Sequence, residues 1–133
     1  MDAHTVKGWI EKRGYAATVK DPHLVVVKLT AGFATKRALP PLYVQISENW
    51  VVLSALPVEV SPAYSLVGTS RALLSLNRKI PVAKFAYGES DEVVLCAELP
   101  TESLDESELL HAIDTLLDCL ERYGDYRPIA PSI

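Results

Sequence analysis

Cysteine and histidine are the first residues in this chain whose types could support chemistry. Cys96 lies in the apolar run 93–97 and Cys119 lies in a segment with helical periodicity, so both fit small buried hydrophobic positions. Neither belongs to a CxxC motif, and the histidines lack the spacing of metal ligands. His111 and Cys119 would lie about two turns apart on one helix, roughly 12 Å, which is too far for a nucleophile–base hydrogen bond.

An acidic cluster near the C-terminal end is the second candidate; its members are Glu98, Glu102, Asp105, Glu106 and Glu108. A hard cation needs converging oxygens, usually from a loop with a sharp glycine turn. These carboxylates instead surround the start of a predicted helix, where they complement its dipole. The serines lack the glycine pattern of a nucleophile elbow, and the glycines are too dispersed for a phosphate loop. We therefore predict no catalytic residue, cofactor or metal, and no enzymatic activity.

Composition indicates one folded domain and a marked separation of charge. The chain has 133 residues and 49% hydrophobic residues, enough for a proper core without disulfides. The net charge is −4, which argues against a protein that binds nucleic acid by neutralising phosphates. Residues 1–88 carry 11 Lys/Arg and 5 Asp/Glu, which is a net charge of +6, whereas residues 89–133 carry 2 Lys/Arg and 12 Asp/Glu, which is a net charge of −10. These halves could meet within one chain, between two copies, or at a partner.

Membrane and secretion signals are missing from the sequence. No stretch reaches the roughly 18–20 apolar residues that span a bilayer. The first residues lack a basic region followed by an apolar run, as a signal peptide would have. We therefore expect no contact with a membrane and a cytoplasmic location, where both cysteines would stay reduced.

Periodicity and turn residues predict three helices and six strands. The helices are expected at 2–13, 63–77 and 104–123, and the strands at 15–20, 24–29, 42–46, 50–56, 81–87 and 92–99. Gly14 should end the first helix with a positive φ, Ser61 should cap the second with Pro62 in its first turn, and Asp105 should cap the third. Residues 30–39, which contain the basic pair Lys36–Arg37, are expected to be a loop.

The order α-ββ-ββ-α-ββ-α predicts an α+β fold, with an antiparallel sheet packed against helices. A single domain should span residues 1–126, followed by an irregular tail at 127–133 with two prolines. The middle helix has an apolar arc wider than one buried stripe needs, so part of it could serve an interface. We name Leu66, Leu73 and Leu76 as candidates for a dimer or partner interface. Trp50, which begins a strand after a hairpin, is a fourth.

The second half of the chain resembles the YbjN family. The resemblance rests on Leu76–Asn77, on Ala83–Lys84–Phe85, on the run 93–100, and on the apolar positions of the closing helix. That family shares the fold of the type III secretion chaperones, the Tir-chaperone-like superfamily. The resemblance implies a small acidic, non-enzymatic α+β domain that is often homodimeric and binds protein.

Two functional classes remain open at this point. The first is a non-enzymatic protein-binding module, chaperone-like or regulatory, which acts as a homodimer with an unknown protein partner. The alternative is a small-ligand-binding protein or enzyme with a pocket between sheet and helices. Binding of nucleic acid through the basic half would need its Lys and Arg side chains to gather on one face, and we expect no such partner.

Overall fold

The computed structural model describes residues 1–29, 39–58 and 65–123, which form three helices and six strands. The elements are α1 (Ala3–Lys12), β1 (Ala16–Asp21), β2 (Leu24–Lys28), β3 (Leu42–Ile46), β4 (Trp50–Val58), α2 (Leu66–Asn77), β5 (Lys84–Tyr87), β6 (Val93–Pro100) and α3 (Glu106–Tyr123). All neighbouring strands are antiparallel, in the order β1-β2-β3-β4-β6-β5. The predicted α+β fold with its antiparallel sheet is confirmed.

Local sequence signals explain how the helices begin and end. The Asp2 carboxylate caps α1 by accepting from the Thr5 N–H at 2.8 Å, and this bond lowers the pKa of Asp2. Gly14 follows the helix with a φ of 102°, as predicted. The N–H groups of Gly14 and Tyr15 return to the carbonyls of Glu11 and Ile10, which is a Schellman motif.

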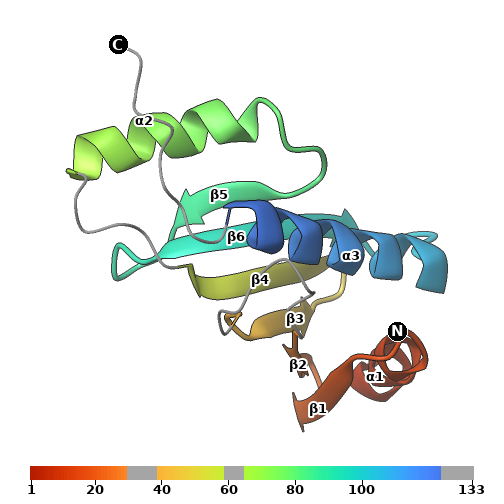
Figure 1. Ribbon diagram of the computed structural model, residues 1–133. Coiled ribbons are helices and arrows are strands. Elements are labelled where there is room, and N and C mark those ends of the chain that lie inside the picture. The colour runs from red at the N-terminus through yellow and green to blue at the C-terminus, as the bar shows by residue number, and fades with distance from the viewer. Residues whose placement is uncertain (30–38, 59–64, 124–133) are drawn as a thin grey trace.

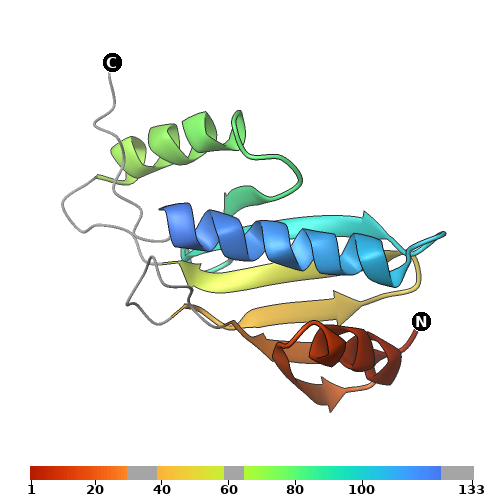
Figure 2. The ribbon, with the colours of Figure 1, turned by 45° about the vertical axis from the view of Figure 1, so that its right-hand side comes forward.

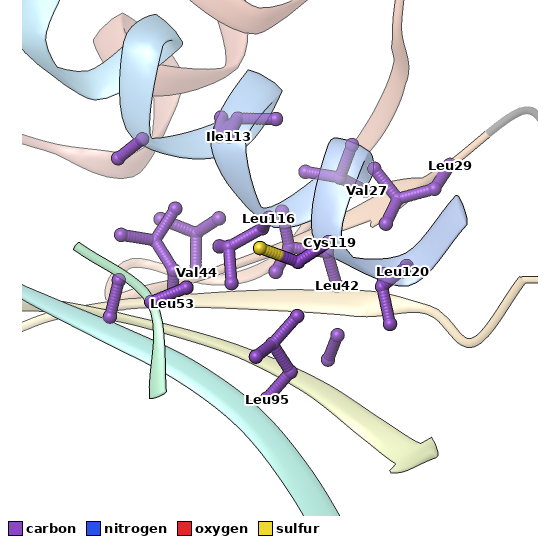
Figure 3. Close-up of a cluster of buried hydrophobic side chains, with 14 of the residues drawn as sticks. Val27, Leu29, Leu42, Val44, Leu53, Leu95, Ile113, Leu116, Cys119 and Leu120 are labelled. Carbon is purple, nitrogen blue, oxygen red and sulfur yellow. The ribbon is translucent and has the colours of Figure 1, made fainter. Parts of the chain in front are cut away.

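The strands alternate between a core face and an open face, which fixes the register of the sheet. One row of paired positions runs across the centre through Val25, Val44, Leu53 and Ala97, and all four side chains are fully or almost fully buried. Figure 3 shows the other half of this core, where Leu116 and its neighbours on α3 point toward side chains of the sheet.

The described helices lie on one side of the sheet and leave its other face without a helix. Figures 1 and 2 show α3 across the middle of the sheet and α1 beside it near β1 and β2. In the same views α2 runs along β5, which is an edge strand. The helix α2 therefore covers the end of the sheet, where a seventh strand would otherwise add.

Several predicted boundaries need correction. The helix α2 begins at Leu66, with Ser65 as its N-cap. The predicted start at residue 63 and the predicted cap Ser61 with Pro62 lie outside the described residues. The strand β5 begins at Lys84 rather than residue 81, because a tight turn with a hydrogen bond from the Ala83 N–H to the Pro81 carbonyl comes first. Of the predicted loop at 30–39, which contains Lys36 and Arg37, only Leu39 is among the described residues, and the predicted tail at 127–133 lies outside them.

Candidate protein-interaction surface

The helix α2 presents two different faces. Its inner face packs into the core through four side chains that are at most 9% exposed: Thr69, Ala72, Leu73 and Leu76. Its N-terminus is closed locally, because the Ser65 hydroxyl accepts from the Gly68 N–H at 3.1 Å. Capping and inner-face packing thus hold the helix with its opposite side turned outward.

The outer face of α2 is apolar and uncovered in the described part of the chain. Leu66 and Val67 are each 65% exposed and Leu74 is 66% exposed. Val67 and Leu74 are seven residues apart, so they lie on one side of the helix two turns apart. Arg71, also exposed, lies between them on the same side. Large apolar side chains this exposed on one helix face are typical of a protein-binding surface.

The segment after α2 adds one more exposed apolar side chain. Val82 is 47% exposed and has a φ of 66°, a conformation that is strongly disfavoured for a β-branched residue. Its turn is closed by the hydrogen bond between Ala83 and Pro81 at 2.7 Å, a γ-turn with positive φ. Val82 therefore adds an exposed apolar side chain to the surface that follows the C-terminal end of α2.

The structure separates the four interface candidates named from the sequence. Leu73 and Leu76 are only 3% and 7% exposed, so they contact the core and cannot touch a partner while α2 stays docked. Leu66 lies on the outer face of α2. Trp50 is 47% exposed and alternates with the buried Val51, so it lies at the margin of the open sheet face. The candidates therefore occupy three different surroundings.

Val67 and Leu74 belong to the exposed surface but were not among the candidates. The sequence shows that the helix is apolar around a wide arc, and apolar residues on both sides look alike in that pattern. Only the position of α2 beside β5 decides which side is covered. The seven-residue spacing of Val67 and Leu74 could not have identified them, because Leu66 and Leu73 have the same spacing and Leu73 is buried.

The open face of the sheet offers a second, less exposed apolar area. Its central positions are half-buried by their neighbours on adjacent strands; they are Val26, Tyr43, Val52, Leu56 and Val94. Charged residues border this area, with Lys84 and Glu98 on the strands β5 and β6. Trp50, at the start of β4, is its most exposed large apolar residue.

The two charged halves of the chain meet in part where α1 ends against α3. Arg13 pairs with Asp114, and Lys12 lies 4.0 Å from Glu106. The Tyr15 hydroxyl donates to the same Asp114 carboxylate at 2.8 Å. Burial, together with this hydrogen bond, raises the pKa of Tyr15 above its ordinary value. Some cations of the basic half therefore pair with carboxylates of the acidic half within the same chain.

An open hollow of about 600 Å³ lies at this junction, lined by residues such as Glu106, Ser107 and His111. It differs from the pocket considered in the sequence analysis, because its lining comes from α3 and the end of α1 rather than from sheet and helices. The Asp114 carboxylate at its wall is already shared by Arg13 and Tyr15. These contacts leave little of that carboxylate for a ligand.

The two cysteines, which are the other candidates for chemistry, lie in buried or half-buried positions. Cys119 is 4% exposed and Cys96 is half-buried, and burial raises the pKa of both thiols, which keeps them in the less reactive protonated form. Across the described ranges, no three His, Cys, Asp or Glu side chains gather as a metal site would require. Likewise, none of the helices there is both long and apolar enough to cross a membrane.

Comparison with known proteins agrees with this architecture. Residues 41–123 match the model of the Tir chaperone protein (CesT) family. No curated protein sequence matches the chain.

Three solved structures share the fold at low sequence identity. One is a chain of the heterodimeric ExoU–SpcU complex from the type III secretion system of Pseudomonas aeruginosa, with a TM-score of 0.60, 20% identity, and coverage of 89% of this chain and 93% of that chain. Another is YbjN from E. coli, described as a putative transcription regulator, with a TM-score of 0.63, 12% identity, and coverage of 91% and 87%. The third is a chain of the ExsC–ExsE complex, with a TM-score of 0.58, 19% identity, and coverage of 98% and 99%.

These findings confirm the resemblance drawn from the second half of the sequence. The structural likeness extends over most of the chain, whereas the family match covers β3 through α3. Because the match spans more than half of the sequence, the chain belongs to the Tir chaperone protein (CesT) family.

Proposed function

We propose that this chain is a non-enzymatic chaperone that binds a segment of another protein and acts as a homodimer in the cytoplasm. The family match supports the chaperone role, and two of the similar folds were solved within complexes named for two proteins. The acting unit in this proposal is the domain of residues 1–126. The partner is a protein, and the proposal includes no cofactor, nucleic acid or membrane.

The observation that carries the proposal is the outer face of α2, which stays exposed within the described ranges of the chain. Leu66, Val67 and Leu74 each expose about two thirds of their surface, although the opposite face of the same helix is packed in the core. A chaperone needs apolar surface that stays accessible in the folded protein, and this helix provides it without loss of its own packing.

An antiparallel pairing of two α2 helices would cover this face in a symmetric dimer. With the twofold axis between residues 67 and 74, Val67 of each copy would pack on Leu74 of the other, in an isologous contact. Arg71 would lie near the axis, opposite its counterpart, and its long stem can lead the charge to solvent. Leu66 would extend the apolar contact at each end of the pair.

Pairing through α2 would leave the open face of the sheet for the partner segment. We assign Trp50 to this second contact, because it is 47% exposed at the margin of that face. Large aromatic side chains of this kind are enriched among the residues that dominate binding energy.

Two measurements test the proposal. Sedimentation of the full chain between 1 and 200 µM should show a concentration-dependent dimer, and a monomer over the whole range would contradict the homodimer. For the chaperone role, the chain isolated from its native cells should carry a protein with a protease-protected segment. Trp50→Ala should shorten that protection, whereas Trp9→Phe, a change at the partly buried tryptophan of α1, should not. Equal protection with both variants would exclude Trp50 from the contact.

A further inference from the structure

Asn77, the last residue of α2, makes with its side chain the two hydrogen bonds that a neighbouring strand would make with β5. Its Nδ2–H donates to the Phe85 carbonyl oxygen at 3.0 Å, and its Oδ1 accepts from the Phe85 N–H at 2.8 Å. A carboxamide has the same donor and acceptor as a peptide group, so Asn77 imitates one residue of a seventh strand.

The backbone N–H and C=O groups of Phe85 lie in the plane of the sheet and point away from β6. In an antiparallel edge strand, alternate residues bond to the inner neighbour and the others present their N–H and C=O outward. Gly88, three residues further on, donates to the Glu92 carbonyl at 2.8 Å, so positions 84, 86 and 88 face β6. Positions 85 and 87 therefore direct their backbone N–H and C=O groups away from β6, and the Asn77 side chain bonds to those of Phe85.

Further contacts hold the helix against this edge. Lys84 extends its Nζ to the Asn77 carbonyl at 2.9 Å and to the Ile80 carbonyl, which closes the C-terminus of α2 with a positive charge. One turn from the start of the helix, the hydroxyls of Ser70 and Tyr87 lie 2.8 Å apart. Figure 1 shows the resulting arrangement, with α2 beside β5 over the length of the strand.

Unprotected edge strands invite pairing with another chain, and folded proteins defend them by several devices. The opposite edge, β1, has an irregularity between Val19 and Asp21 and an exposed Lys20, which are common defences. The edge at β5 has a different defence, because a side-chain amide replaces the missing strand. We propose that Asn77 is an edge plug, which closes β5 to strand addition by a second copy of this chain.

Hydrogen exchange tests the plug at its two bonds. In Asn77→Ala the Phe85 amide should exchange with water at least tenfold faster than in the wild-type protein. Ser70→Ala, which loosens α2 without touching the plug, should leave that rate within twofold. Equal acceleration by both variants would mean that helix docking alone protects the edge, and would overturn the proposal.

The wild-type protein offers a test that does not depend on a variant. One side-chain amide proton of Asn77 should exchange more slowly than both side-chain amide protons of Asn49, an exposed asparagine in the β3–β4 turn. Rates for Asn77 as fast as those for Asn49 would contradict the plug.

Self-association tests the consequence for a second copy. We would measure it in a Leu74→Asp background, so that the proposed pairing through the outer face of α2 does not contribute. Addition of Asn77→Ala should tighten association at least tenfold, and further addition of Tyr87→Pro, which removes an outward N–H but no bond to β6, should reverse the gain. Unchanged association on addition of Asn77→Ala would overturn the proposal and leave the α2 dimer unaffected.

Discussion

Leu74→Asp should separate the proposed dimer into folded monomers. Leu74 is 66% exposed in the monomer, and complete burial of a leucine side chain contributes about 1.5–3 kcal/mol. Covering the exposed two thirds therefore contributes about 1–2 kcal/mol per copy, or about 2–4 kcal/mol per symmetric dimer. A loss of that size weakens the dimer by about 30- to 1,000-fold, and the buried carboxylate adds to it.

Sedimentation equilibrium measures the dissociation constant directly, and Ser75→Asp is the matched control. Ser75 is the next residue on the helix and is exposed, so the same charge is added in the same turn without removal of the leucine. Both variants should keep the melting temperature of the wild-type protein within a few degrees. Equal dissociation constants for the two variants would refute the assignment of the interface to Val67 and Leu74.

Ionic strength adds a signature that depends on the geometry of the pair. An antiparallel dimer would place the two Arg71 side chains near each other, so salt should screen their repulsion and strengthen association. If the acidic half of one copy instead met the basic half of the other, salt would weaken association. Weaker association in 0.5 M than in 0.05 M NaCl would therefore exclude the antiparallel arrangement.

Three further changes follow from the packing and from the raised pKa values. Tyr15→Phe should lower the free energy of unfolding by about 1–2 kcal/mol at pH 7, as urea unfolding would show. Because the pKa of Tyr15 is raised in the folded protein, this advantage of the wild-type chain is fully present below pH 10, where the unfolded tyrosine is still protonated. The advantage should decline above pH 10, so it should be smaller in the same assay at pH 10.5. Leu116→Ala, at a side chain with 0% exposure, should cost about 2–5 kcal/mol in the same assay, and a cost below 1 kcal/mol would contradict the packing against the sheet. At pH 7.5, iodoacetamide should modify Cys96 before Cys119 and both more slowly than glutathione, as mass spectrometry would report; the reverse order would contradict the burial of Cys119.

Local signals predicted most of the fold because they do not depend on distant residues. The Schellman end at Gly14 follows from a glycine after two cations, and the Asp105 cap of α3 is observed as a 2.8 Å bond from the Glu108 N–H. The β3–β4 turn was predicted from its length, and Ser47 and Trp50 close it by a backbone hydrogen bond of 2.8 Å.

The exposed face of α2, which is the proposed interface, could not be predicted to the same extent, because it depends on which side of the helix packs against the core. Leu73 and Leu74 are neighbours of the same type, yet one is 3% exposed and the other 66%. The helix α2 packs beside β5, which is an edge strand, and Leu73 lies on the side of the helix that joins the buried core. The role of Asn77 was hidden for a similar reason, since an asparagine at a helix end is unremarkable until a strand edge lies beside it.

The positions of the helices show which charges of the basic and acidic halves pair within the chain and which stay exposed. The cations at the end of α1 meet the acids of α3 within the chain, through Arg13 with Asp114 and Lys12 with Glu106. The helix α2 contains no acidic residue, and the exposed Arg71 and Arg78 remain on or beside its apolar face. Repulsion between such faces would oppose pairing of two copies, so the apolar contact would have to hold the proposed dimer by itself. A partner with acidic side chains beside its apolar ones would compete for the same face, and would do so best at low salt.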